Sequence, residues 1–359
     1  MSCIYYGNQE GLTYNKREHV FPASLGCKTM LPKGWVSDQA NEFFSKMEDD
    51  FTHRSLIAMD RAFWGPGQRG SLSVKKAAKT DVCIGVDETG DCVLSYLSLG
   101  VPYIISQFKR EKGRFHIHLD PTNRNTALSD FIVALKNFTP NSKYIRIPTK
   151  ELKKSCIVGY HDRKYYIAFN PDEVDDFAIA KEISFFLKFS DKITSVDTFH
   201  DSKSHITMDH RSTETNETSR ICSKTLMNTL AYLHGPEFVQ RDEFRDFREW
   251  ILEGKHPEKF ATLPTVLSNQ PYAQTFPEKA HWCLFGMIKN HLVGEVCFYG
   301  HFARTFSMGV FDEAPIYHLE GFICDWENQT DYKLLDYILK CRHLTNKKIP
   351  RNTNERTIF

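Results

Sequence analysis

Residues 15–44, NKREHVFPASLGCKTMLPKGWVSDQANEFF, decide the fold of the first part of the chain. They contain an acidic residue beside a histidine, Glu18-His19, and a separate Asn41 ahead of an aromatic pair. Neighbouring residues in a regular strand face opposite sides, so Glu18 and His19 can serve one site only at a strand end or a bulge. Pro22 follows at a position where it can end such a strand. This pattern predicts a short strand that leads into a turn.

The second half of the stretch contains the start of a helix. Ser37 and Asp38 are residue types that cap helix N-termini. Large apolar side chains then recur at helical spacing, at Phe43, Phe44, Met47 and Phe51. We expect the helix to bury this aromatic face against the preceding strands, which gives the order strand, strand, helix.

Glu18, His19 and Asn41 are residue types that suit hydrolysis of a phosphodiester. A neutral imidazole, with an ordinary pKa of about 6.5, can take a proton from water near neutral pH. Mg²⁺ prefers oxygen ligands, which the Glu18 carboxylate and the Asn41 amide supply, and it keeps waters that phosphate oxygens can replace. Taken alone, these residues would equally suit an exposed strand-end pair and a helix-cap asparagine.

The stretch resembles the HNH endonucleases of the ββα-metal type, in the branch that reads CxxC, then EH-x-x-P-x-x-x-G, then CxxCN-x-x-F. Residues 18–26, EHVFPASLG, match the middle motif, and residues 36–44, VSDQANEFF, align with the last. The resemblance implies that Glu18 and Asn41 are ligands of one Mg²⁺ or Mn²⁺ per site and that His19 is the general base. It covers the N-terminal module alone and says little about the rest of the chain.

The chain departs from the family at the structural zinc ligands. The first CxxC falls on residues 3–6 and the second on residues 37–40, and only Cys3 remains of the four ligands that such a site needs. We predict that structural zinc is absent and that apolar packing against the larger domain replaces it, through Tyr5, Tyr6, Trp35, Val36 and Phe43. The alternative is a remade zinc site built from Cys3, Cys27, Asp38 and His53.

A second departure lies in the loop between the two matching motifs. The family's middle asparagine, which braces the loop that carries the histidine, has no counterpart between residues 20 and 40. Its absence does not touch Glu18, His19 or Asn41. The sequence therefore leaves open what holds the histidine in place.

Residues 61–80, RAFWGPGQRGSLSVKKAAKT, are basic and contain no acidic residue. Gly and Pro interrupt any regular element there. A solvated linker would have the same composition, and the functional interpretation is an arm that contacts the phosphates of a nucleic acid. The candidate nucleic-acid-binding residues are Arg61, Arg69, Lys75, Lys76 and Lys79.

Strand-like patterns dominate residues 81–169, helical patterns dominate residues 172–254, and strand-like patterns return after that. This order predicts an α+β fold with mainly antiparallel strands. The predicted domains are a ββα-metal nuclease module at residues 1–60, a basic linker or DNA-contacting arm at 61–80, and a larger recognition or regulatory α+β domain at 81–359.

Two other groups of residues offer rival sites. His116 and His118 lie two apart and share one face of a predicted strand, but no third ligand is near in sequence, which favours an exposed strand face. Asp209-His210 is a second acid-histidine pair, followed by Asn216. Its Ser/Thr-rich surroundings are typical of a loop before a capped helix.

Composition sets broad limits on partners and location. The 359 residues include 46 Lys and Arg against 45 Asp and Glu, so any nucleic-acid surface must be a local patch. The 10 cysteines form no CxxC pair, which indicates buried small residues in a reducing compartment. No apolar run approaches the ~18 residues of a membrane span. We expect a cytoplasmic protein without a membrane partner.

The leading hypothesis is therefore a metal-dependent HNH endonuclease that acts on DNA, with a role in bacterial defence or restriction implied by the resemblance. The alternative is a catalytically inactive nucleic-acid-binding or scaffold protein, which the missing zinc ligands support. The same chemistry on RNA, or on nicked or branched substrates, stays open. One HNH site cuts one strand, so double-strand cleavage would require a homodimer or two visits.

Overall fold

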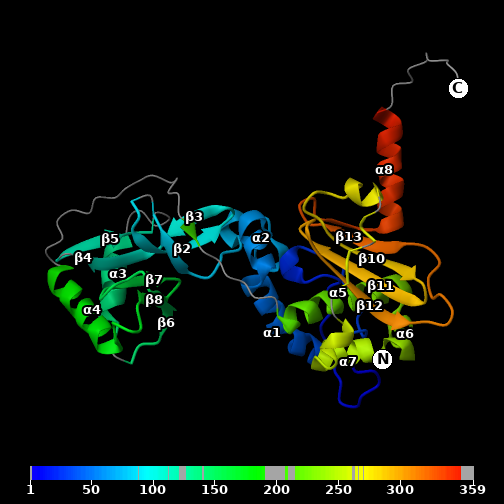
Figure 1. Cartoon of the computed structure of the whole chain (residues 1–359), viewed down its shortest axis with the longest axis horizontal. Helices are drawn as coiled ribbons and strands as arrows, with labels where there is room; N and C mark the ends of the chain where they lie inside the picture. The colour runs from blue at the N-terminus through cyan, green and yellow to red at the C-terminus, as the bar shows by residue number, and fades with distance from the viewer. Residues whose placement is uncertain are drawn as a thin grey trace. The chain divides into compact units, whose positions relative to one another are not determined.

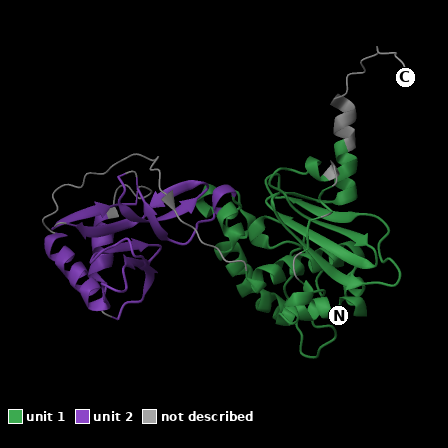
Figure 2. Ribbon diagram, in the orientation of Figure 1, with its two compact units in different colours: residues 1–61, 65–77, 212–359 green, residues 62–64, 78–211 purple. Residues whose placement is uncertain are grey.

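The computed structural model describes residues 2–87, 89–111, 113–120, 127–139, 141–190, 207–208, 215–260, 263–265, 267–269 and 271–348. These residues form an α+β fold whose strands are mainly antiparallel, as predicted. Figure 2 shows that the chain divides into two compact units. Unit 1 holds residues 1–61, 65–77 and 212–359, and unit 2 holds residues 62–64 and 78–211. This division differs from the predicted one, which separated residues 1–60 from residues 81–359, since the N-terminal module shares a unit with residues 212–359.

The N-terminal module has an isolated antiparallel bridge, and no regular strand among the described residues, where the sequence predicts a short strand. The backbone N–H of Val20 donates to Thr29 O at 3.0 Å, and that of Leu31 donates to Glu18 O at 2.7 Å, around a bridge between His19 and Met30. The elements that follow in the chain are η1 (Ala23–Leu25) between the bridged residues, then α1 (Asp38–Arg54) and α2 (Leu56–Trp64).

Helix α1 begins where the sequence predicts. Ser37 is its N-cap, and the Ser37 hydroxyl accepts a hydrogen bond from the backbone N–H of Ala40 at 3.2 Å. Phe44 and Phe51 are buried on one side of the helix, with Met47 partly buried beside them. The helix of the predicted strand, strand, helix order is therefore present, while the described residues before it form isolated bridges in place of regular strands.

Unit 1 contains one antiparallel sheet (Figure 1). Its strand order is β12-β11-β10-β13-β14, and the strands are β10 (His281–Ile288), β11 (His291–Phe298), β12 (Phe302–Val310), β13 (Glu320–Asp325) and β14 (Thr330–Lys333). Side chains alternate between its two faces, so that Cys283 and Phe285 join one buried cluster while Trp282 and Leu284 join another. The second cluster includes the start of α8 (Leu334–Lys348).

Helix α5 (Asn216–His234) packs against both α1 and this sheet, and every residue from Arg220 to Ala231 is buried. The Thr215 hydroxyl caps its start by accepting a hydrogen bond from the backbone N–H of Thr218, and the helix ends at Gly235. A helix buried on all sides is a core helix. The remaining helices of unit 1 are α6 (Pro236–Val239), η4 (Asp242–Phe244), α7 (Arg245–Glu253), η5 (Pro257–Phe260) and η6 (Pro271–Thr275), with η2 (Gln68–Gly70) and η3 (Val74–Lys76) in the basic stretch.

Unit 2 contains two sheets. The first has the order β3-β2-β1-β9, from β1 (Cys83–Val86), β2 (Cys92–Ser98), β3 (Val101–Ile104) and β9 (Thr207–Met208). The second has the order β5-β4-β7-β8-β6, from β4 (Ser106–Glu111), β5 (Arg114–His118), β6 (Tyr144–Pro148), β7 (Cys156–His161) and β8 (Lys164–Phe169), and only its β6–β8 pair is parallel. Helices α3 (Ala127–Lys136) and α4 (Asp176–Ser190) complete the unit. Phe108 and Phe186 stack at 4.2 Å in the core that these helices share with the second sheet.

Among the described residues, no helix is long and apolar enough to cross a membrane.

Candidate active site

Glu18 lies beside a buried lysine that the sequence did not indicate. Lys224 Nζ on α5 is 2.5 Å from Glu18 Oε1 and 2.6 Å from Glu48 Oε1, and the Lys224 side chain is only 2% exposed. Burial opposes the charged form of Lys224, but the two carboxylates outweigh it and raise its pKa. Burial also raises the pKa of Glu18, and Glu48 adds to this while Lys224 counteracts it. One ammonium group is therefore held between two acidic side chains.

His19 is held in place from the same helix. Asn228 Nδ2 donates a hydrogen bond to the backbone O of His19 at 3.0 Å, and the Tyr5 hydroxyl donates to Asn228 Oδ1 at 2.6 Å. Asn228 and Lys224 lie four residues apart on α5, so they share one side of that helix. Asn228 thus supports the backbone at His19. In the family that the stretch resembles, an asparagine in the loop braces the histidine, and residues 20–40 of this chain contain none.

The environment of His19 favours its neutral form. Burial lowers the pKa of His19, and the charges of Lys224 and Lys28 lower it further, while Glu48 and Asp331 act in the opposite direction. Together these effects lower the pKa of His19 from its ordinary value. They favour the neutral imidazole, which is the form that can accept a proton from water.

Asn41 is the fourth residue of α1 and has an unsatisfied side chain. Both its Oδ1 and its Nδ2 are buried, and neither has a hydrogen-bond partner among the described residues. An unsatisfied buried polar group costs about 1–3 kcal/mol, so this amide is a place where a ligand would be favoured. The structure joins Glu18 and His19 into one network, but no hydrogen bond within the described part of the chain links Asn41 to either of them.

The glycine that ends the EHVFPASLG stretch is required by its surroundings. Gly26 has a φ of 93°, and a Cβ at this position would lie 2.7 Å from Trp326 Cβ. Any other residue would have to adopt the left-handed conformation, and its Cβ would displace Trp326 in the turn after β13. This explains the glycine without any appeal to chemistry.

A buried histidine anchors the same loop to the sheet. His281 Nε2 donates to Leu25 O at 3.1 Å, and His281 Nδ1 accepts from the backbone N–H of Tyr299 at 3.0 Å. Burial lowers the pKa of His281 to about 3, which keeps the ring neutral and preserves both hydrogen bonds. The loop after His19 is thereby fixed from β10.

The residues of the alternative zinc site do not come together. Within the described residues, Cys27 lies near Cys324 and Asp331 instead of near Cys3, Asp38 and His53. The predicted packing is confirmed for four residues, since Tyr5 and Val36 are buried in the core and Tyr6 and Trp35 pack against it. It is wrong for Phe43, which is 40% exposed, because Phe44 takes the inward position on α1.

Asp38 has a different task from metal binding. Its carboxylate accepts hydrogen bonds from the backbone N–H groups of Asn15 and Lys16 and from the Thr13 hydroxyl, at 2.7–3.0 Å. These bonds favour the charged form and lower the pKa of Asp38 to about 2. Asp38 therefore ties the loop before Glu18 to the start of α1.

Replacing Asp38 with asparagine is expected to lower the stability of the protein near neutral pH, because an amide accepts these hydrogen bonds more weakly. A carboxylate whose pKa is lowered on folding stabilises the protein above its unfolded pKa, and this contribution is lost as the pH falls. The stability difference between wild type and Asp38→Asn should therefore shrink as the pH falls from 3.8 to about 2. Urea unfolding at several pH values measures it. The exposed Asp312→Asn serves as control, and an equal pH dependence in both variants would contradict the assignment.

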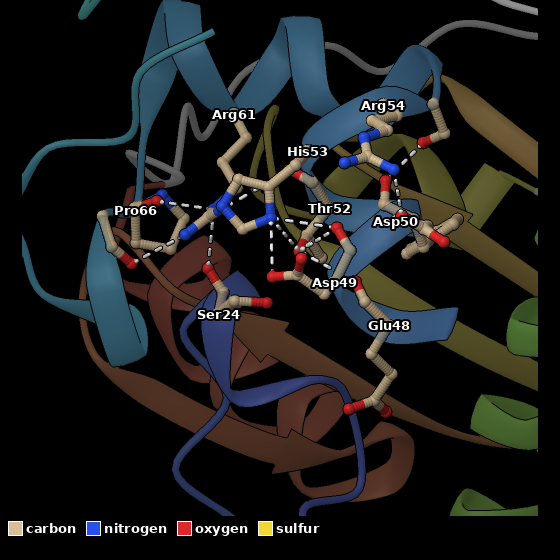
Figure 3. Close-up of polar contacts among 12 residues, drawn as sticks. Ser24, Glu48, Asp49, Asp50, Thr52, His53, Arg54, Arg61 and Pro66 are labelled. Atoms are coloured by element: carbon tan, nitrogen blue, oxygen red, sulfur yellow. Dashed lines mark hydrogen bonds and ion pairs between the residues drawn. The ribbon is translucent and has the colours of Figure 1, made fainter. Parts of the chain in front are cut away.

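The prediction that Arg61 contacts nucleic acid is wrong. Arg61 is only 2% exposed, and Figure 3 shows its guanidinium surrounded by hydrogen-bond acceptors. It donates to the backbone O atoms of Ser24, Thr52, Pro66 and Gly67 at 3.2–3.3 Å. These hydrogen bonds hold the turn after α2 against the N-terminal module and occupy the guanidinium group.

The other basic residues of the stretch differ in their surroundings. Arg69, Lys75 and Lys76 are exposed on unit 1. Lys79 is exposed on unit 2, where its Nζ lies 3.4 Å from Asp162 Oδ2 and 4.9 Å from the centre of the Tyr96 ring. The first three therefore remain the candidates for contacting phosphates.

Neither rival group replaces the site at Glu18 and His19. His116 is exposed on β5, as predicted for a plain strand face, and burial lowers the pKa of His118. Asp209 and His210 lie outside the described residues, and Asn216 is the first residue of α5.

Lys224 and Asn228 are the residues of this network that the sequence did not reveal. The stretch KTLMNTLAYL hints at them, because both are polar residues among apolar ones in a buried helix. A buried polar residue needs a partner, but a sequence does not say which one. No protein-family model, curated protein or solved structure matches this chain.

Proposed function

We propose that this chain is a metal-dependent endonuclease of the HNH type that hydrolyses phosphodiester bonds in DNA. The observation that supports it is a partly buried His19, whose pKa burial lowers, beside Glu18 at an antiparallel bridge, followed by a helix with an unsatisfied Asn41 amide. A role in bacterial defence or restriction is the wider setting that the resemblance implies.

In this proposal Glu18 and Asn41 bind one Mg²⁺ or Mn²⁺. The two oxygen ligands suit a hard divalent cation, and the free Asn41 amide fits the role. When bound, the metal would stabilise negative charge on the phosphate and on the leaving oxygen. His19 takes the proton from the attacking water, and Asn228 holds the His19 backbone in position. The exposed Arg69, Lys75 and Lys76 would contact phosphates next to the cut.

A second candidate function is favoured by Lys224. Its ammonium already pairs with Glu18 at 2.5 Å, so the carboxylate has a partner without any metal. A module neutralised in this way would serve a catalytically inactive nucleic-acid-binding or scaffold protein. The two candidates differ in one measurable respect, which is cleavage.

The test is cleavage of supercoiled plasmid by the full-length protein with Mg²⁺ or Mn²⁺, with single-stranded DNA and RNA in parallel. Wild type should produce nicked circles, and EDTA should stop the reaction. Asn41→Ala should reduce the rate by at least roughly 10–100-fold, which is the loss typical of removing even an outer-shell partner of a metal site. Glu42→Ala, an exposed neighbour on α1, is the matched control and should cut normally.

Three other outcomes would change this proposal. Full activity of Asn41→Ala would remove Asn41 from the site. No cleavage of any nucleic acid by wild type would reject the nuclease in favour of the binding function. Linear product without a nicked intermediate would indicate that two protomers act together as a homodimer.

A further inference from the structure

Three side chains with metal-binding atoms meet at the edge of the unit 1 sheet, beside the loop that follows His19. They are Cys27, Cys324 on β13 and Asp331 on β14, and one ligand atom from each lies within 4.8 Å of the other two. Cys324 and Asp331 are directly opposite each other in the β13–β14 ladder, so their side chains project from the same face. The third ligand comes from a segment about 300 residues away in sequence.

Among the described residues, hydrogen bonds reach one carboxylate oxygen of Asp331 and leave the other without a partner. Its Oδ2 accepts hydrogen bonds from the backbone N–H groups of Lys28 and Thr29, at 2.9 and 2.7 Å, and from the Thr29 hydroxyl at 2.8 Å. Its Oδ1 is buried and has no hydrogen-bond partner among the described residues. A buried carboxylate oxygen without a partner is costly, and here it points to a missing cation.

We propose that Cys27, Cys324 and Asp331 bind one Zn²⁺ through their two sulfur atoms and the carboxylate. Two sulfur ligands select a soft or borderline metal such as zinc over Mg²⁺ or Ca²⁺, which prefer oxygen alone. The Cys27 thiol donates a hydrogen bond to Asp331 Oδ2 at 3.6 Å, so Cys27 Sγ already lies beside the carboxylate whose Oδ1 would bind zinc. A solvent molecule would fill the fourth position.

Burial sets the charge that this site could hold. Cys27 and Cys324 are 2% and 0% exposed, so their thiols would lose their protons only together with binding of a cation. Zinc would then offset two of the three negative charges of the two thiolates and the carboxylate. The bound ion would connect the loop after the EHVFPASLG stretch to the β13–β14 hairpin, and it would stabilise unit 1 by cross-linking three segments. This site is separate from the proposed Mg²⁺ ligands and does not depend on nuclease activity.

The test is metal content of the full-length protein, purified under reducing conditions, incubated with Zn²⁺ and freed of excess metal. We expect one Zn²⁺ per chain in wild type, and Co²⁺ in its place should give the absorption bands of cobalt-thiolate bonds. Cys27→Ser and Cys324→Ser should lose the metal and the bands. Cys297→Ser is the matched control, because Cys297 is an equally buried cysteine of the same sheet outside the group.

Asp331→Asn is a second test of the site that does not require a cysteine variant to fold. Its amide oxygen can still accept the loop hydrogen bonds, while its NH₂ group replaces Oδ1 and cannot bind zinc. Weaker zinc binding by this variant, with an unchanged circular dichroism spectrum, supports the proposal. Absence of zinc from reduced wild type would overturn it, as would equal zinc content in Cys27→Ser and Cys297→Ser. A Cys27–Cys324 disulfide that forms in air, with no zinc uptake after reduction, would overturn it as well.

Discussion

Replacing His19 with alanine is expected to slow plasmid cleavage by roughly 10²–10⁴-fold, which is the usual contribution of a positioned general base. The His19 backbone is held by Asn228 through its carbonyl group, and alanine keeps that carbonyl. The variant should therefore fold normally and lose only the proton acceptor. Rates of nicking under single-turnover conditions measure the effect. His318→Ala, a 73% exposed histidine of the same unit, is the matched control and should cut like wild type.

The acid side of the pH–rate profile gives a second readout for His19. Because burial lowers the pKa of this residue, the imidazole should become protonated at a lower pH than an ordinary histidine. The acid decline in wild-type cleavage should therefore be centred below the ordinary histidine pKa of about 6.5. Normal cutting by His19→Ala would refute the general-base role. A decline centred above pH 6.5 would show that burial does not control this histidine.

Replacing Lys224 with methionine is expected to cost about 3–5 kcal/mol of unfolding free energy, as is usual when one partner of a buried ion pair is removed. The methionine fills similar space, but it leaves Glu18 and Glu48 facing each other without the ammonium group between them. Urea unfolding at pH 7 measures the loss. Lys46→Met, at an exposed position on α1, is the control and should change stability little.

The loss in Lys224→Met should also depend on pH in a defined direction. Without Lys224, burial and the mutual repulsion of Glu18 and Glu48 favour the protonated form of both carboxyl groups in the folded state. Their pKa values therefore rise above those of the unfolded chain. A raised pKa favours folding at low pH and disfavours it as the pH increases. The variant should therefore come closer to wild-type stability in acid. Wild-type stability at pH 7 would show that the ion pair does not hold α5 against the module.

Local features of the fold could be predicted because they depend on neighbouring residues. The N-cap at Ser37 and the antiparallel strands are decided by a few consecutive side chains. The adjacency of Glu18 and His19 is likewise a matter of sequence alone. The basic stretch shows the limit of such reasoning, since Arg61 looks like its basic neighbours but is buried among backbone carbonyl groups. Composition does not reveal burial.

The sequence by itself determined the capped helix α1 and the adjacency of an acid and a histidine before it. Only the tertiary structure decided what surrounds them. Lys224 contacts Glu18 across 206 positions, and Asn228 contacts His19 across 209. Ionisation, hydrogen bonding and metal binding depend on such distant partners, because they follow the distance between atoms and their burial, whatever the separation along the chain.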